Sequence, residues 1–180
     1  MPLTTYISGE VLTAASLNDN FTYAAANGGK IIQVVSVVKT DTFSGSSASY
    51  IDITGITVTI TPTSATNKVF VFANIQGSNP AGVAVAIMQL VRDSTAIAVG
   101  DASGSRSVGT SSLNGGSDGN ILSSNIIAFL DSPATTSATT YKVQAKSTAG
   151  TFVVNRSSTD ASSAAGSRTV STITVFEVQA

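Results

Sequence analysis

Side chains that commonly perform chemistry are scarce in this sequence. Its 180 residues include no histidine and no cysteine, which excludes a Ser-His-Asp triad, a thiolate nucleophile, disulfides and an ordinary zinc or copper site. Ten acidic residues are present, but they occur singly rather than in the pairs that acid–base hydrolysis of glycosides requires. We therefore expect a protein that is not an enzyme and that has no cofactor.

One loop carries enough oxygen atoms to be considered as a metal site. Residues 114–120 read NGGSDGN, and carboxylate, carbonyl and amide oxygens are the ligands that Ca²⁺ prefers. The segment lacks the alternating acids and the closing glutamate of an EF-hand loop. A plain loop is the favoured interpretation, and no metal is predicted.

Two residues have side chains suited to ligand contact. Tyr50 stands where a loop joins a strand, from which an aromatic ring can stack on a sugar or, more commonly, cover the edge of a core. Arg106 lies in the middle of the longest predicted loop, where it grips a ligand or, more commonly, is solvated or at a subunit contact.

The composition limits the classes of partner. Only 11% of the residues are charged, and the net charge is −1. Binding to nucleic acid or to an anionic membrane needs clustered Lys and Arg, so neither partner is expected. The longest apolar run, 81–91, falls well short of the roughly 20 residues of a membrane span. A nearly neutral surface instead suits a protein packed against copies of itself.

From residue 30 onward the pattern is one of strands and turns. Val, Ile, Thr and Phe dominate the runs, and Gly, Ser, Asn and Pro separate them. The central hairpin covers 83–99, with a tight turn at Asp93 and Ser94. We predict an all-β, jelly-roll-like antiparallel sandwich over 30–180. Its expected strands are 31–39, 50–61, 68–76, 83–92, 95–99, 121–130, 140–147, 151–156 and 169–179.

The strands differ in how many of their faces are apolar. Residues 56–61 and 141–146 alternate between apolar and polar side chains, which predicts one wet face. Residues 31–38, 69–75, 83–91 and 170–178 are apolar on both faces. A packed loop or another subunit must cover the second face, and we expect a homotrimer. The pattern leaves open which face is core; the contact candidates are Ile32, Val34, Phe70, Phe72, Met88 and Leu90.

Residues 1–29 form a separate N-terminal segment. Thr13 can cap a helix over 14–26, in which Leu17 and Phe21 make a narrow apolar stripe. A helix this short is marginal alone, so it must dock on its own domain or on a larger assembly. We favour the assembly, for which the attachment candidates are Leu12, Leu17 and Phe21.

Long connections rich in small polar residues cover 40–49, 100–120 and 157–167. Loops of such length are usually functional or disordered. If consecutive strands run antiparallel, turns alternate between the two ends of the sandwich. Loops 40–49, 77–82 and 100–120 then share the end remote from the N-terminal segment, while 157–167 lies at the near end.

Six segments occur in this order along the chain: GGKIIQVVSVVKTDTFS, ITGITVTITPTSATNKVFV, QLVRDSTAIAVGDA, FLDSPATTSATTYKVQAK, TFVVNRS and STITVFEV. In this combination they resemble a family of tailed-phage virion proteins, the tail-fibre or minor structural proteins. The opening GEVLTAASLNDNF is similar to a short attachment segment at the start of several such fibres. The resemblance covers residues 9–178, and the family has no catalytic residues to transfer.

The resemblance implies a bacteriophage virion component, assembled in the host cytoplasm and held by other virion proteins of the tail, baseplate or capsid. The leading hypothesis is a short tail fibre for host attachment, whose distal loops touch a host-surface glycan. The alternative is a capsid decoration or cement protein that clamps shell subunits. A depolymerising fibre enzyme is disfavoured, because no paired carboxylates are evident. The receptor-contact candidates are Tyr50, Asn79, Arg106, Asn114 and Asp118.

Overall fold

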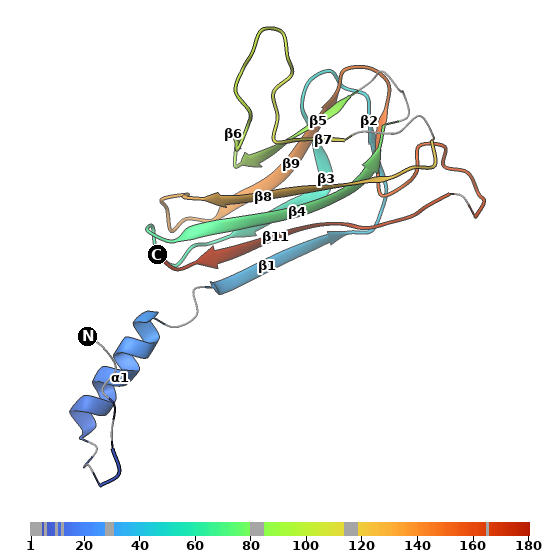
Figure 1. The fold of residues 1–180 in the computed structure, drawn as a ribbon. Helices are drawn as coiled ribbons and strands as arrows, with labels where there is room; N and C mark the ends of the chain where they lie inside the picture. The colour runs from blue at the N-terminus through green and yellow to red at the C-terminus, as the bar shows by residue number, and fades with distance from the viewer. Residues whose placement is uncertain are drawn as a thin grey trace.

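The computed structural model describes residues 5, 7–9, 11, 13–27, 31–79, 85–113, 119–164 and 166–180. Within them the chain is mostly β, with one short helix and two antiparallel sheets packed face to face (Figure 1). This confirms the predicted all-β sandwich and its preceding helix. The elements are α1 Ala14–Asn27, β1 Ile31–Lys39, β2 Phe43–Gly45, β3 Ile51–Ile60, β4 Lys68–Ser78, β5 Ala86–Arg92, β6 Thr95–Ile97, β7 Ser111–Leu113, β8 Ser123–Asp131, β9 Thr139–Ser147, β10 Phe152–Val154 and β11 Ser171–Val178.

The strand order brings together segments that are far apart in the sequence. The six-stranded sheet runs β1-β11-β4-β10-β2, with β8 on the other edge of β4. The five-stranded sheet runs β3-β9-β5-β6, with β7 also paired to β5. The core lies between the sheets and includes the fully buried Ile53, Val71, Val143, Phe152 and Ile173.

The two kinds of strand predicted from the sequence belong to different sheets. Residues 31–38, 69–75 and 170–178, apolar on both faces, correspond to β1, β4 and β11 of the six-stranded sheet. Residues 56–61 and 141–146, with one wet face, correspond to β3 and β9 of the five-stranded sheet. Residues 83–91, also apolar on both faces, are the exception, because they correspond to β5 of the five-stranded sheet. The hydrophobic pattern therefore separates most of these strands, but not all, by sheet.

The prediction of a subunit contact is wrong for the two candidates on β5. Met88 and Leu90 are completely buried in the core of the single chain, so they cannot meet a neighbouring copy. The segment just before β7 packs beside β5 and against its outward-facing Ile87. The backbone NH of Thr110 donates to the carbonyl of Met88 at 2.8 Å, and Gly109 sits against Ile87 so closely that a Cβ there would overlap it.

The two ends of the sandwich carry different connections. We call the end of the sandwich nearer to α1 the proximal end and the opposite end the distal end. The proximal end holds the start of β1, the 61–67 turn, the Asp93-Ser94 turn and the C-terminus, and the distal end holds loop 40–50 (Figure 1). Loop 155–170 also lies at the distal end, where the NH of Thr159 donates to the carbonyl of Gly119. Its predicted place at the near end is therefore wrong, because β10 is only three residues long and never crosses the sandwich.

The predicted loop 100–120 is also not one loop. β7 interrupts it and pairs with β5 over Ala86–Met88. Its first part, 98–110, projects from the edge of the five-stranded sheet rather than from an end (Figure 1). In its second part, residues 114–118 lie outside the described residues. They include most of the segment that was weighed as a calcium site.

α1 stands apart from both sheets, beyond the proximal end of the sandwich (Figure 1). Its start confirms the predicted cap, because the backbone NH of Ser16 donates to the Thr13 hydroxyl at 3.2 Å. Leu17 is half-buried and Phe21 is 63% exposed, while Leu12 lies outside the described residues. The apolar stripe is thus presented away from the chain's own core.

Among the described helical residues, no stretch is long and apolar enough to cross a membrane.

Candidate functional site

The outer face of the six-stranded sheet carries an apolar row that crosses four strands. Strand register places Val34 opposite Phe176, Phe176 opposite Phe70, and Phe70 opposite Leu130. The rings of Phe70 and Phe176 lie with centroids 6.0 Å apart. Side chains directly opposite each other on one face contact across the strands, so the row forms one continuous ridge.

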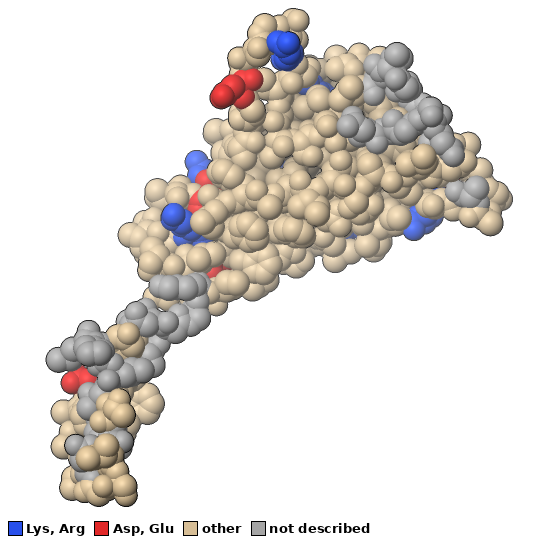
Figure 2. Space-filling view, viewed as in Figure 1, with Lys and Arg blue, Asp and Glu red and all other residues tan. Residues whose placement is uncertain are grey.

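Neighbouring outward positions extend this row into what we call the apolar face. Val34 is 54% exposed and Leu130 is 46% exposed. Figure 2, in which this sheet is nearer the viewer, shows a broad uncharged surface with the charged side chains near its margins. The apolar face comprises Ile32, Val34, Phe70, Phe72, Ile126 and Leu130, with Phe176 in the central row.

The outer face of the five-stranded sheet is polar by contrast. The amide of Gln89 donates to Gln144 at 2.7 Å, and the amide of Gln144 donates to Asp52 at 2.7 Å. Lys142 completes the chain with an ion pair of 2.9 Å to the same carboxylate. The hydrogen bonds from Lys142 and Gln144 lower the pKa of Asp52. The two outer faces of the sandwich therefore have opposite character.

The receptor-contact candidates do not form one site. The Tyr50 hydroxyl donates a hydrogen bond to the carbonyl of Val108. The Lys146 ammonium lies 4.8 Å from the centroid of the Tyr50 ring. Tyr50 therefore contacts the base of loop 98–110. Arg106 is exposed and donates to the carbonyl and hydroxyl of Ser103 within that loop. Asn79 is completely buried, which contradicts a receptor contact there. Asn114 and Asp118 lie outside the described residues.

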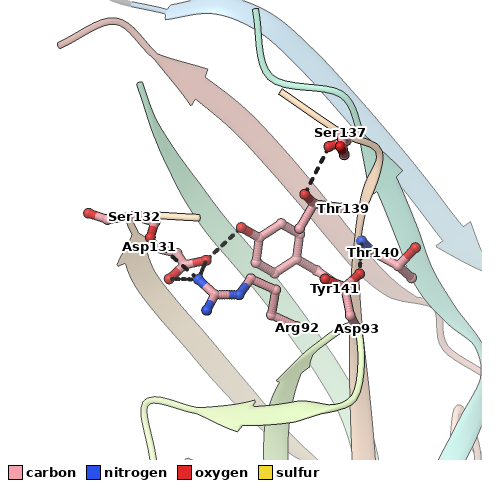
Figure 3. Close-up of polar contacts among 8 residues, drawn as sticks. All are labelled: Arg92, Asp93, Asp131, Ser132, Ser137, Thr139, Thr140 and Tyr141. Carbon is pink, nitrogen blue, oxygen red and sulfur yellow. Dashed lines mark hydrogen bonds and ion pairs between the residues drawn. The ribbon is translucent and has the colours of Figure 1, made fainter. Parts of the chain in front are cut away.

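A buried polar cluster joins three strands at the proximal end (Figure 3). Both oxygens of Asp131, at the end of β8, lie 2.9 Å from Nη1 of Arg92 on β5. The hydroxyl of the fully buried Tyr141, on β9, donates to the same carboxylate at 2.7 Å. Burial, followed by the bond to Asp131, raises the pKa of Tyr141 far above its usual range. This cluster ties the two sheets together, because β8 belongs to one sheet and β5 and β9 belong to the other.

A second buried carboxylate, Glu177 of β11, is enclosed by the 61–67 turn. Its Oε1 accepts from the NH of Thr63 at 2.6 Å, the Thr63 hydroxyl at 2.8 Å and the Asn67 amide at 2.7 Å. When the Gln33 amide is oriented with its nitrogen toward Glu177, it donates to Oε2 at 3.2 Å. Burial alone would raise the pKa of Glu177, but the bonds from Asn67 and Thr63 outweigh it and lower that pKa.

Because the folded-state pKa of Glu177 is lowered, this group adds stability above its ordinary value of 4.5, and that stability is lost as pH falls through the folded pKa. We expect the free energy of unfolding to decrease below about pH 4.5, and to decrease less in Glu177→Gln. Urea unfolding from pH 7 to pH 3 measures the difference. Parallel pH profiles for the two proteins would contradict this assignment.

Comparison of the sequence with models of known protein families and with curated proteins found no match. The apolar face is the feature of this structure that bears most directly on function.

Proposed function

We propose that this chain is a non-enzymatic structural protein of a tailed-phage particle, a short tail fibre built as a trimer of jelly-roll domains. The exposed apolar face of the six-stranded sheet is the observation that carries the proposal. Contiguous apolar patches of this kind are uncommon on soluble monomers and mark contact surfaces. Ile32, Val34, Phe70 and Phe72, which the sequence suggested as subunit contacts, all project from this face.

The strand order supports the jelly-roll assignment. Eight strands, counted first to eighth along the chain, are β1, β3, β4, β5, β6, β8, β9 and β11. The six-stranded sheet then contains the first, eighth, third and sixth in that order, and the five-stranded sheet the second, seventh, fourth and fifth. Two interleaved Greek keys produce this order, which occurs in viral capsid and lectin domains.

The long axis of the molecule supports a tether at one end and a contact at the other. α1 lies beyond the proximal end, and the long polar loops 40–50 and 155–170 lie at the distal end (Figure 1). A particle-bound helix would direct the distal end outward, where a host-surface glycan is the proposed partner. Weak single contacts there would be multiplied by trimeric display.

Locating the protein on purified particles tests this proposal. Gold-labelled antibody against the sandwich should decorate the tail or baseplate in electron micrographs. Decoration of the shell would instead favour the capsid-cement alternative, which uses the same apolar face. Unlabelled particles from a phage that encodes this chain would contradict both.

Removal of α1 should separate folding from attachment. We expect a chain lacking residues 1–27 to keep the thermal unfolding midpoint of the sandwich, because α1 lies apart from both sheets (Figure 1). The same truncation should abolish incorporation into particles, as measured by immunoblot of purified virions. A truncated chain that fails to fold, or one that still enters particles, would refute the attachment role.

A further inference from the structure

A cleft of about 660 Å³ opens on the outer side of the six-stranded sheet at its distal end. The cleft is shallow and open to solvent, and its volume lies within the roughly 300–1,000 Å³ of small-molecule sites. Two residues with amide side chains, two threonines, an arginine and a valine line it. They are Thr40, Asn74, Gln76, Arg168, Thr169 and Val170.

The cleft exists because two strands share one edge of β4 and then separate. β11 pairs with β4 up to Asn74, and β10 pairs with β4 only at Gly77 and Ser78. Between these two pairings, the backbone NH of Gln76 donates to the Ser171 hydroxyl. The backbone carbonyl of Gln76 accepts from the NH of Asn155. Side-chain and loop contacts thus replace strand pairing, and the gap is a built part of the fold rather than a surface irregularity.

The polar groups of the cleft are fixed in place but not saturated. The Gln76 amide donates to Asn74 at 3.2 Å and to Ser124 at 2.8 Å, and Ser124 donates to Asn74 at 2.8 Å. This leaves Nδ2 of Asn74 and Oε1 of Gln76 without hydrogen-bond partners among the described residues. The Thr169 hydroxyl is buried and also has no partner in the described part of the chain.

The rim of the cleft is positively charged. Arg168 is 61% exposed and pairs with Asp160, which also faces Arg156 at 3.6 Å. Two guanidinium groups on one carboxylate leave a net charge of +1. A planar guanidinium binds carboxylates through paired hydrogen bonds, and free amides and hydroxyls suit the hydroxyl groups of a sugar.

We propose that this cleft binds sugars that carry a carboxylate, with Arg168 on the carboxylate and Asn74, Gln76 and Thr40 on ring hydroxyls. The proposal rests on the proposed function, because it names the class of host glycan and places its site in the cleft beside loops 40–50 and 155–170. The apolar row through Val34 and Leu130 lies toward the proximal end, so a subunit contact centred on that row leaves the distal cleft open. Ile126, at the distal margin of the apolar face, lies opposite Asn74 and would border the cleft.

Titration calorimetry of the purified full-length protein tests the cleft directly. The acidic probes are a galacturonate tetrasaccharide and sialyllactose, and the neutral controls are maltotetraose and lactose. Arg168→Gln should weaken binding of the acidic probes about tenfold or more, as expected when a charge-assisted hydrogen bond is lost. Thr40→Val should weaken binding a few-fold. Arg106→Gln makes the same charge change in loop 98–110 and should leave binding unchanged.

Three results would overturn the proposal: no binding of either acidic probe at millimolar concentration, equal binding of acidic and neutral probes, or a loss in Arg106→Gln equal to that in Arg168→Gln. The measurement needs no virion, so it fails or succeeds separately from the proposed function. If the protein binds acidic sugars but is absent from phage particles, the proposed sugar site stands and the proposed tail-fibre function is refuted.

Discussion

Replacing Val34 and Leu130 together by glutamate should convert the proposed trimer to a monomer. Both side chains are about half exposed in the single chain, so the change should affect assembly far more than folding. Complete burial of a Val or Leu side chain contributes about 1.5–3 kcal/mol, and because these are already about half buried, the six in a trimer would supply roughly 5–9 kcal/mol. The new carboxylates would also have to lose their hydration at the contact. Sedimentation velocity at micromolar concentration measures the change.

A matched control lies on the opposite face of the sandwich. Thr57→Glu adds a carboxylate to β3, at an exposed position opposite Lys142, and should leave the trimer intact. Circular dichroism should show the same β content in all variants. A wild-type protein that sediments as a monomer, or a double variant that remains trimeric, would remove the apolar face as the subunit contact.

Asp131→Ala should cause the largest loss of folding stability among single substitutions in the buried polar clusters. It would leave the Tyr141 hydroxyl buried without an acceptor and Arg92 without its carboxylate. Removing one member of a buried ion pair costs about 3–5 kcal/mol. Arg92 retains some contact with solvent, so we expect about 3 kcal/mol, a large share of the roughly 5–15 kcal/mol that stabilises a typical domain. Urea unfolding at pH 7 gives the free energy.

Two further variants separate burial from charge. Tyr141→Phe removes only the hydroxyl and leaves Asp131 paired with Arg92, so it should cost about 1 kcal/mol. Asp52→Ala removes a half-exposed carboxylate that also meets a lysine and an amide, and it should cost less than about 1 kcal/mol. If Asp131→Ala costs no more than Asp52→Ala, the cluster in Figure 3 does not fasten the sheets.

The sequence was sufficient for the long strands because their side chains alternate at a fixed period. β1 has the predicted bounds, and β3, β4, β8, β9 and β11 differ from prediction by two residues or fewer at each end. The Asp93-Ser94 turn also forms as predicted, between Arg92 and Thr95. Local pattern and local turn chemistry decide such elements.

Elements defined by distant contacts were missed. β2 and β7 are three residues long and rich in Ser and Gly, and they are strands only because β10 and β5 pair with them. The cleft residues Asn74, Gln76 and Arg168 carried no signal in the sequence, because they meet where β10 and β11 separate. The sequence also did not determine which face of β5 lies in the core, since Met88 and Ile87 point to opposite faces and are both apolar. Only the loop packed against Ile87 distinguishes the two faces.

The antiparallel pairing of β1 with β11 has a mechanical consequence. β1 begins at the proximal end beside α1, and its partner β11 ends there. Tension between a tethered helix and a distal contact would therefore run along β1, perpendicular to the hydrogen bonds that join it to β11. The bonds from Ile31 to Lys39 would then resist in shear, all together, instead of opening one after another like a zipper.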